Sequence, residues 1–421
     1  MKILSTSDWH LGNLFHGNDR LPEHKHFLSW LLCQISEQQP DALLIAGDVF
    51  DNGNPSAAAQ SAYYEFLADA IQRCPQMQII VIAGNHDSAS RLEAPRPLLS
   101  RHKVEIRGNV KRKWVTADQD GYWEFDYEDL IIPIRNQSGE ELVVLAVPYL
   151  RSDIIQNANY SEGVNKFIRE LTAKARILYP NANLIMMAHM YADGSNIAEE
   201  SSEKIIIGGL EMVSMNKWDD HPDYLTCGHI HRRQNIWETD WAQYTGSVLP
   251  MSFAEKDYEH GIDMITFING VLSSVDFLEY KPQHKLRILP EDDVDLTINK
   301  LKKLIEDELK DKTDGVLDDE FDYVVLKVKL DRINNDVIKD LEEQVNSKNA
   351  VLCKIQKIMP ALEISTIDGE KQIVSVDDIL KRDPLDALKE TFLLKHGIGM
   401  SQTQEDMLRE VIDSIQTVTN D

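Results

Sequence analysis

The sequence predicts a layered α/β sandwich, followed by a smaller α/β domain and C-terminal helices. Short apolar strands alternate with helical segments over the first 280 residues, and a second alternation of strands and helices begins after residue 280. Alternation of this kind is typical of layered α/β domains. We therefore expect three parts: a large domain at residues 1–280, a capping domain at 281–372 and a helical docking segment at 373–421.

The first part contains buried strands with helices between them. The strands are predicted at residues 2–6, 42–46, 79–83, 142–147, 184–188 and 224–227, and the helices at 24–39, 56–73 and 161–178. Several of these strands end directly in polar clusters. Because α/β proteins build their sites at the carboxyl ends of sheet strands, the clusters are candidates for a functional site.

The second and third parts have patterns of their own. Residues 285–289, 323–330 and 350–359 are predicted strands, with helices at 294–309 and 335–346 between them, which indicates a small α/β unit with a separate core. Segments 377–380, 384–394 and 404–415 carry apolar residues at helical spacing. Those short helices either pack back on the domain or dock on another protein.

Composition narrows the class of protein. The 421 residues carry a formal net charge of -26, which argues against a general basic surface for DNA, because Lys and Arg neutralise phosphates in such binding. The apolar run at the N-terminus is too short for a signal peptide, and no uncharged stretch is long enough to span a bilayer, so we expect a cytoplasmic protein. Cys33, Cys74, Cys227 and Cys353 lack the paired spacing of a zinc site or a disulfide framework.

Residues of metal-ligand type follow five of the predicted strands. They are Asp8, His10, Asp48, Asn85, His189, His229 and His231. Two divalent ions lying close together need about eight hard or borderline ligand positions and one shared carboxylate. Each cluster alone is a weak signal, but five clusters in this arrangement predict a two-metal site.

The motifs resemble a known family. The strings DWH, GDVFD, GNHD, AHM and GHIH, followed by Gly246-Ser247, are similar to the signature of calcineurin-like metallophosphoesterases. TSDWHLG, LLIAGDVFDNGNPS, VIAGNHDS, CGHIH and GSVLPMSF resemble its SbcD subfamily over roughly the first 255 residues. The resemblance implies a calcineurin-like metallophosphoesterase sandwich, a capping domain and C-terminal helices.

The resemblance also implies roles for the candidate ligands. Asp8, His10 and His231 would hold one ion, Asn85, His189 and His229 would hold the other, and Asp48 would bridge them. Mn²⁺ is the metal expected from the family, although the ligands by themselves do not exclude Fe²⁺, Zn²⁺ or Mg²⁺. A hydroxide activated by both ions would attack the phosphorus.

Two neighbouring residues would complete the catalytic set. By family analogy His86 would stabilise the developing charge or protonate the leaving oxygen, and Asp87 would orient His86 or a neighbouring ligand. Archaeal and eukaryotic relatives place a histidine where this chain has Asp51, so a role that depends on an imidazole does not transfer to that position.

A site for phosphoester hydrolysis does not by itself identify the substrate. A locally basic stretch at residues 91–113 follows the GNHD motif, and Arg91, Arg96, Arg101 and Lys103 are candidate contacts to a DNA backbone; the alternative is a solvated face. The resemblance implies exonuclease action on double-stranded DNA ends and endonuclease action on hairpins or single strands, in DNA recombination, repair and replication.

The resemblance further implies a homodimer within a heterotetramer that contains an SbcC-like, SMC-type ATPase, without membrane association. One alternative is a stand-alone metallophosphodiesterase or phosphatase that acts on small or protein substrates. Another is a scaffold that has lost catalysis, but in such a protein we would expect replaced ligands, and none is replaced here.

Overall fold

The computed structural model divides into two compact units. It describes residues 1–117, 120–155, 159–196, 212–215, 218, 220–292, 296–313, 315–329, 334–358, 362–365, 371–374 and 389. The first unit comprises Met1–Leu286 with Asp319–Phe321, and the second begins at Arg287. Apart from Lys389, the predicted helices at 377–380, 384–394 and 404–415 lie outside the described residues.

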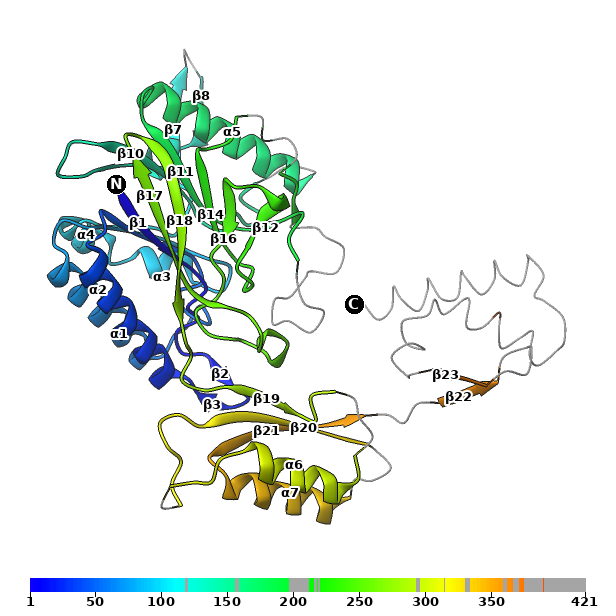
Figure 1. The fold of residues 1–421 in the computed structure, drawn as a ribbon. Coiled ribbons are helices and arrows are strands. Elements are labelled where there is room, and N and C mark those ends of the chain that lie inside the picture. The colour runs from blue at the N-terminus through cyan, green and yellow to red at the C-terminus, as the bar shows by residue number, and fades with distance from the viewer. Residues whose placement is uncertain are drawn as a thin grey trace. The chain divides into compact units, whose positions relative to one another are not determined.

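The first unit is built on two six-stranded mixed sheets (Figure 1). In strand order, the first sheet contains β18 (Val271–Tyr280), β17 (His260–Ile268), β1 (Lys2–Thr6), β4 (Ala42–Ala46), β5 (Gln78–Ile82) and β6 (Val104–Arg107). The second contains β15 (Gln234–Asn235), β16 (Ala242–Tyr244), β14 (Tyr224–Gly228), β11 (Asn183–His189), β10 (Glu141–Val147) and β9 (Ile131–Arg135). Strands β1, β4, β5 and β6 run parallel in one sheet, as do β10, β11, β14 and β16 in the other.

Helices cover the outer faces of both sheets. They are α1 (Leu21–Gln38), α2 (Ala57–Arg73), α3 (Ala89–Glu93), α4 (Arg96–Leu99) and α5 (Tyr160–Leu178), with short 3₁₀ turns at Ser100–His102, Tyr127–Leu130, Ile236–Glu238 and Phe253–Glu255. Helices α1 and α2 share an apolar core with the first sheet, and α5 shares one with the second. The layered α/β sandwich predicted from the sequence is confirmed.

A third core fills the space between the two sheets. Ile3 and Leu44 from the first sheet meet Val144 and Met187 from the second, and all four are fully buried. Side chains alternate along a strand, so neighbours such as Leu4 point to the helical layer instead. Burial on both faces explains why these strands appear as continuous apolar runs in the sequence.

The structure also contains strands that the sequence pattern does not predict. Strands β17 and β18 form an antiparallel hairpin that extends the first sheet beside β1. Further pairs are β2 (Leu14–Phe15) with β3 (Asn18–Asp19), β7 (Arg112–Ala117) with β8 (Asp120–Phe125), and β12 (Tyr191–Ala192) with β13 (Met212–Val213). Most of β18 is partly exposed, so its composition is mixed and lacks the apolar run of a central strand.

Local signals determine where the long helices begin. Helix α1 starts at Leu21, earlier than the predicted residue 24, with a proline in its first turn, where the missing N–H costs no helical hydrogen bond. The side chain of Ser56 caps α2 by accepting from the N–H of Ala59, and Asn159 caps α5 by accepting from Glu162.

The second unit has its own α/β core. Strand β19 (Leu286–Leu289), helix α6 (Ile298–Glu308), strand β20 (Asp322–Lys329), helix α7 (Asn335–Ser347) and strand β21 (Ala350–Ile358) follow the predicted order. The sheet order is β19-β20-β21, and β20 and β21 are parallel. Ile305, Val324 and Leu341 are among the fully buried residues of this core. A hairpin of β22 (Leu362–Ser365) and β23 (Lys371–Val374) follows.

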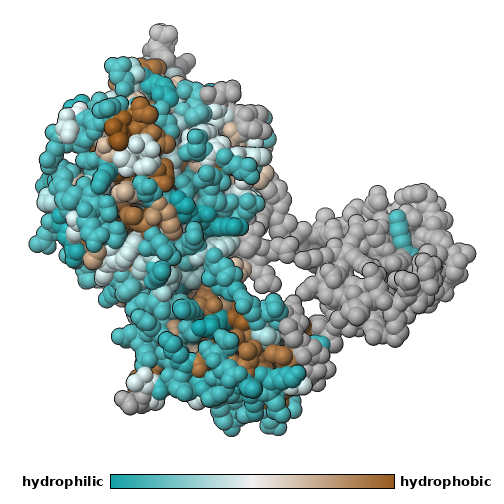
Figure 2. Space-filling view, viewed as in Figure 1, coloured by the Kyte–Doolittle hydropathy of each residue, from teal (hydrophilic) through white to brown (hydrophobic). Residues whose placement is uncertain are grey.

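The visible surface agrees with the acidic, polar composition. Figure 2 shows mostly hydrophilic residues over the face of the first unit that is in view, with separate apolar patches between them. Within the described parts of the chain, no helix combines the length and the apolar character that crossing a membrane requires.

Candidate metal centre

All seven predicted ligands gather at the carboxyl ends of strands from both sheets. Asp8 and His10 follow β1, Asp48 follows β4, and Asn85 follows β5; His189 ends β11, and His229 and His231 follow β14. Backbone contacts hold these loops together, because the N–H of Asp8 donates to the carbonyl oxygen of Gly47 and the N–H of His229 donates to the Asp8 carboxylate.

Three of these side chains converge on one point. The Oδ1 atom of Asn85 lies 2.9 Å from Nε2 of His189 and 3.0 Å from Nδ1 of His229. Ligand atoms that share an ion at about 2.1 Å lie roughly 3 Å apart. His189 directs its other nitrogen, Nδ1, to the carbonyl oxygen of Ala46 at 2.9 Å, which turns Nε2 toward the cluster.

A second set of donor atoms lies beside the first. Ligand atoms of Asp8, His10 and His231 all lie within 4.8 Å of one another. Both ring nitrogens of His10 are buried and, among the described residues, have no hydrogen-bond partner, as expected of an imidazole that needs an ion to satisfy it.

Asp48 lies between the two sets. Its Oδ2 atom is 3.4 Å from Nε2 of His189 and 3.7 Å from Nε2 of His10. Its Oδ1 atom accepts the backbone N–H of His86 at 2.9 Å. A carboxylate in this position fits a bridge between two ions.

The backbone is strained at four of the seven ligands. Asp8, His10, Asp48 and His229 have φ angles of 51°, 47°, 48° and 102°. A positive φ is uncommon for residues other than glycine and costs on the order of 1–3 kcal/mol, so its concentration here marks a functional site.

Glycines before the ligands make room for neighbouring side chains. A Cβ atom on Gly47 would lie 2.3 Å from Nδ1 of His189, and one on Gly84 would lie 2.1 Å from Oδ1 of Asp48. Both distances are far below van der Waals contact, so these positions exclude any larger residue.

Burial and mutual charge set the protonation of the cluster in the absence of metal. Burial lowers the pKa of His10 and lowers that of His229 to about 3. Burial alone would raise the pKa of Asp48, but the imidazoles of His189 and His10 hold it below its usual value. Burial disfavours the charged form of the His189 imidazole. The Asp48 carboxylate outweighs this effect and raises the pKa of His189 to about 9. Binding of a metal by His189 would therefore release a proton.

His86 is exposed and lines a cleft of about 460 Å³ together with five of the seven candidate ligands. Its Nδ1 atom is 2.8 Å from the carbonyl oxygen of Asp51, and its ring is edge-on to that of His10, with 4.9 Å between centroids. Asp51 also accepts a hydrogen bond from Asn13 at 2.8 Å.

Asp87 contacts the backbone of the ligand loops. Its buried carboxylate accepts the N–H groups of Val49, Phe50 and Gly84 at 3.1, 3.0 and 2.9 Å. Burial and the nearby Asp48 raise its pKa to about 6. These contacts connect the loops that carry Asp48 and Asn85, so they fit the predicted support of neighbouring ligands rather than a contact with His86.

Part of the basic stretch is paired with acidic residues of the same unit. Arg96 forms ion pairs with Asp129 at 2.6 Å and with Glu93 at 3.0 Å, and Arg107 and Lys111 join the same group. Arg96 is half-buried and engaged, whereas Arg91, Arg101 and Lys103 are exposed. Arg91, Arg101 and Lys103 are therefore better candidates than Arg96 for contacts with phosphates.

One residue of the site has no prediction from the sequence. Glu255 is fully buried, and its Oε1 atom lies 3.3 Å from Nδ1 of His231. A signal was present, because Glu255 follows the GSVLPMSF motif closely, but a lone acidic residue after a motif does not reveal which side chain it contacts.

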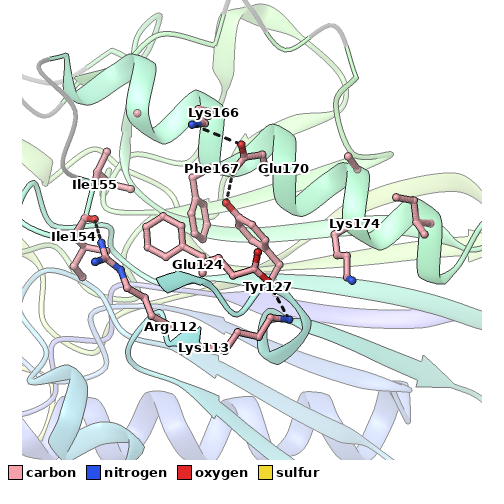
Figure 3. A pocket seen from close by; sticks show the side chains of 14 residues that line it. Arg112, Lys113, Glu124, Tyr127, Ile154, Ile155, Lys166, Phe167, Glu170 and Lys174 are labelled. Atoms are coloured by element: carbon pink, nitrogen blue, oxygen red, sulfur yellow. Dashed lines mark hydrogen bonds and ion pairs between the residues drawn. The ribbon is translucent and has the colours of Figure 1, made fainter. Parts of the chain in front are cut away.

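A second cleft, of about 650 Å³, lies between the β7–β8 hairpin and α5 (Figure 3). Phe167 and Tyr127 line it, and the hydroxyl of Tyr127 donates to Glu170 at 2.6 Å. Two of its lysines pair with glutamates of the lining, Lys166 with Glu170 at 3.9 Å and Lys113 with Glu124 at 3.6 Å. The cleft contains none of the predicted site residues.

The two-sheet sandwich and its cluster of Asp, Asn and His side chains define a metallophosphoesterase, a hydrolase of phosphoesters. Residues 1–233 match the family described as calcineurin-like phosphoesterase, and the chain belongs to this family.

Relatives within the family specify the group. The chain is similar to three SbcD proteins, each named as part of the nuclease SbcCD. It is 33% identical to that of Rhodobacter capsulatus over 281 residues, 64% of this chain and 67% of the relative. It is 30% identical to that of Escherichia coli K12 over 310 residues (70% and 72%), and 31% identical to that of Bacillus subtilis over 278 residues (63% and 66%). It is a member of the SbcD group of calcineurin-like phosphoesterases.

Proposed function

We propose that this chain is a metal-dependent DNA nuclease that works with an SbcC-type ATPase in DNA recombination, repair and replication. One observation carries the proposal: seven candidate ligands from both sheets meet in one cluster, with Asp48 between two sets of donor atoms. Relatives named as parts of a nuclease support DNA as the substrate and a second protein as the partner.

The donor atoms suit two divalent ions. Asp8, His10 and His231 would hold one ion, Asn85, His189 and His229 would hold the other, and Asp48 would bridge them. The mixed set of oxygens and imidazole nitrogens suits Mn²⁺, which we propose as the metal. When bound, two such ions activate water and polarise phosphoryl oxygens for hydrolysis of a phosphodiester.

The chain's own groups would position the substrate and move a proton. His86 directs Nδ1 to the carbonyl oxygen of Asp51, which leaves Nε2 for the cleft, where the imidazolium form of His86 would protonate the leaving oxygen. Asp87 would keep the loops of Asp48 and Asn85 in place through its contacts with backbone N–H groups.

We propose exonuclease action on double-stranded DNA ends and endonuclease action on hairpins or single strands, by a homodimer within a heterotetramer. The net charge of -26 supports a partner that supplies much of the DNA-binding surface, because 70 acidic residues outnumber the 44 Lys and Arg that could neutralise phosphates. Arg91, Arg101 and Lys103 are the exposed candidates for local contacts.

The test measures Mn²⁺-dependent degradation of end-labelled linear duplex and hairpin DNA, beside hydrolysis of a small chromogenic phosphodiester. Asp48→Ala should lower both activities by about 1,000-fold or more, since two-metal activation supplies several kcal/mol and each 1.36 kcal/mol is tenfold in rate. Asp257→Ala, at a carboxylate that is 80% exposed, is the matched control and should behave as wild type.

The reaction is run with and without an SbcC-type ATPase and ATP. Loss of DNA degradation in Asp48→Ala but not in Asp257→Ala would support the nuclease. Hydrolysis of the small ester with DNA untouched in both settings would contradict it and favour a stand-alone phosphodiesterase.

A further inference from the structure

Glu255 is held rigidly behind a candidate metal ligand. Its Oε2 atom accepts the N–H of Met251 at 2.8 Å, and its Oε1 atom accepts the hydroxyl of Ser252 at 3.2 Å. The same Oε1 atom lies 3.3 Å from Nδ1 of His231, and the Glu255 side chain is fully buried. The short turn that contains Glu255 therefore fixes the carboxylate, and the carboxylate faces the imidazole.

We propose that Glu255 is a positioning residue that orients His231 and strengthens it as a metal ligand. An imidazole that donates Nδ1–H to a carboxylate presents the lone pair of Nε2 in a fixed direction, and the carboxylate makes that nitrogen more basic. The inference rests on the proposed metal centre, and it assigns a role to a residue outside the ligand set.

His189 and His10 are supported differently. His189 donates to a neutral carbonyl oxygen, that of Ala46. The carboxylate oxygen of Asp51 is 3.7 Å from Nδ1 of His10, too far for a hydrogen bond, and the Asp51 side chain is 26% exposed. Asp8, His10 and His231 are the proposed ligands of one ion. Of the two imidazoles among them, His231 is the one whose ring faces a fully buried carboxylate.

The burial of the Glu255 carboxylate fits a role behind a metal ligand. A carboxylate removed from water loses hydration, and hydrogen bonds from Met251 and Ser252 restore part of it. A neutral side chain in this place would lose less hydration than a carboxylate. A buried charge directed at a metal-ligating imidazole is explained by the ion, because the ion's positive charge favours it.

The test measures Mn²⁺ binding to the metal-free full-length chain, without DNA. Free Mn²⁺ is followed by its electron paramagnetic resonance signal during a titration, which gives the number of sites and their affinities. We expect two sites in the wild type. Glu255→Gln should weaken one of them by about 10- to 100-fold and leave the other unchanged. The matched control is Asp257→Asn, the same chemical change at a nearby exposed carboxylate, which should bind as wild type.

A double-mutant cycle separates action through His231 from a general effect on the fold. Glu255→Gln added to His231→Asn should cause no further loss of Mn²⁺ affinity, because the imidazole through which Glu255 acts is already gone. An additional loss equal to that of Glu255→Gln alone would overturn the proposal.

The remaining outcomes are distinct. Fewer than two Mn²⁺ sites in the wild type would contradict the proposed metal centre itself. Two wild-type sites with unchanged affinities in Glu255→Gln would overturn only the role of Glu255. If Glu255→Gln fails to fold, Glu255→Asp keeps the charge but withdraws it from Nδ1; it should weaken one site, and two sites of full affinity would overturn the proposal.

Discussion

The Nδ1 atom of His86 lies 2.8 Å from the carbonyl oxygen of Asp51, and the backbone N–H of His86 donates to the Asp48 carboxylate at 2.9 Å. These two contacts place the imidazole beside the candidate bridging ligand, and ligand atoms of His10, Asp48 and His86 all lie within 4.8 Å of one another. This position fits the role of proton donor that we propose for His86.

His86→Asn should therefore keep both metal ions and lose most turnover. We expect activity on duplex DNA to fall by about 10²- to 10⁴-fold, the usual contribution of a general acid or base. Metal content and turnover number are measured on the same preparation. His102→Asn, a change at an exposed histidine, serves as the control. Unchanged turnover in His86→Asn would remove this residue from the mechanism.

Gly84→Ala should disrupt the metal centre by a purely steric route. The added Cβ would lie 2.1 Å from Oδ1 of Asp48 and would displace this carboxylate. We expect activity to fall by at least about 100-fold, with a loss of roughly 1–3 kcal/mol in unfolding free energy from overpacking.

Gly53→Ala is the matched control for that prediction. Gly53 lines the same cleft, but its added Cβ would have only ordinary contacts, the nearest at 3.6 Å. Mn²⁺ binding and hydrolysis are compared in the two variants. Equal activities would show that the space at Gly84 is not needed by Asp48.

Stability should decline below pH 6.5 partly through His24. Burial, with a smaller contribution from the charge of Arg20, lowers the pKa of His24 from 6.5 to about 3. Above pH 6.5 this histidine is neutral in both the folded and the unfolded chain. As the pH falls below 6.5, only the unfolded chain takes up the proton, so the unfolding free energy falls by about 1.4 kcal/mol per pH unit until the pH approaches 3.

His24→Leu should remove that dependence. Denaturant unfolding between pH 6 and pH 4.5 in the presence of a chelator gives the slope for each protein. The variant's slope should be shallower by about 1.4 kcal/mol per pH unit. Parallel curves for the two proteins would rule out His24 as a contributor.

The arginines of the basic stretch should divide into two functional groups. Arg91→Ala and Arg101→Ala should leave the unfolding free energy within about 0.5 kcal/mol of wild type, since both side chains are exposed. Each should weaken DNA binding and lower the slope of log affinity against log salt by about 0.9 if it contacts a phosphate.

Arg96→Ala should behave in the opposite way. It leaves the Asp129 carboxylate without its strongest partner and the Glu93 carboxylate without one of its two cationic partners. The ion pairs hold the pKa values of both carboxylates low, so the change should cost about 1–3 kcal/mol of stability. DNA binding, measured in the metal-free state to prevent cleavage, should change little. If Arg96→Ala alone changed the slope of log affinity against log salt, Arg96 would be the DNA contact and Arg91 and Arg101 would not.

The central strands, the long helices and the types of residue that carry the chemistry could all be predicted from the sequence alone. Strands such as β4 and β11 are buried on both faces, so each is a local apolar run that can be recognised without knowing its neighbours. The ligand residues follow those runs directly, and the motifs in which they stand indicate the family. Strand β18 is mostly partly exposed and has no such local signature, and the sequence pattern does not predict the hairpin that it forms with β17.

Tertiary packing determines which side chains contact one another. His229 and Asn85 are far apart in the chain but 3.0 Å apart in space, because strands of two different sheets end at the same edge of the sandwich. The same packing brought Glu255 behind His231 and engaged Arg96 with Asp129. Such contacts depend on distances and directions across the fold, whereas a sequence pattern records only the order and spacing of residues along one chain.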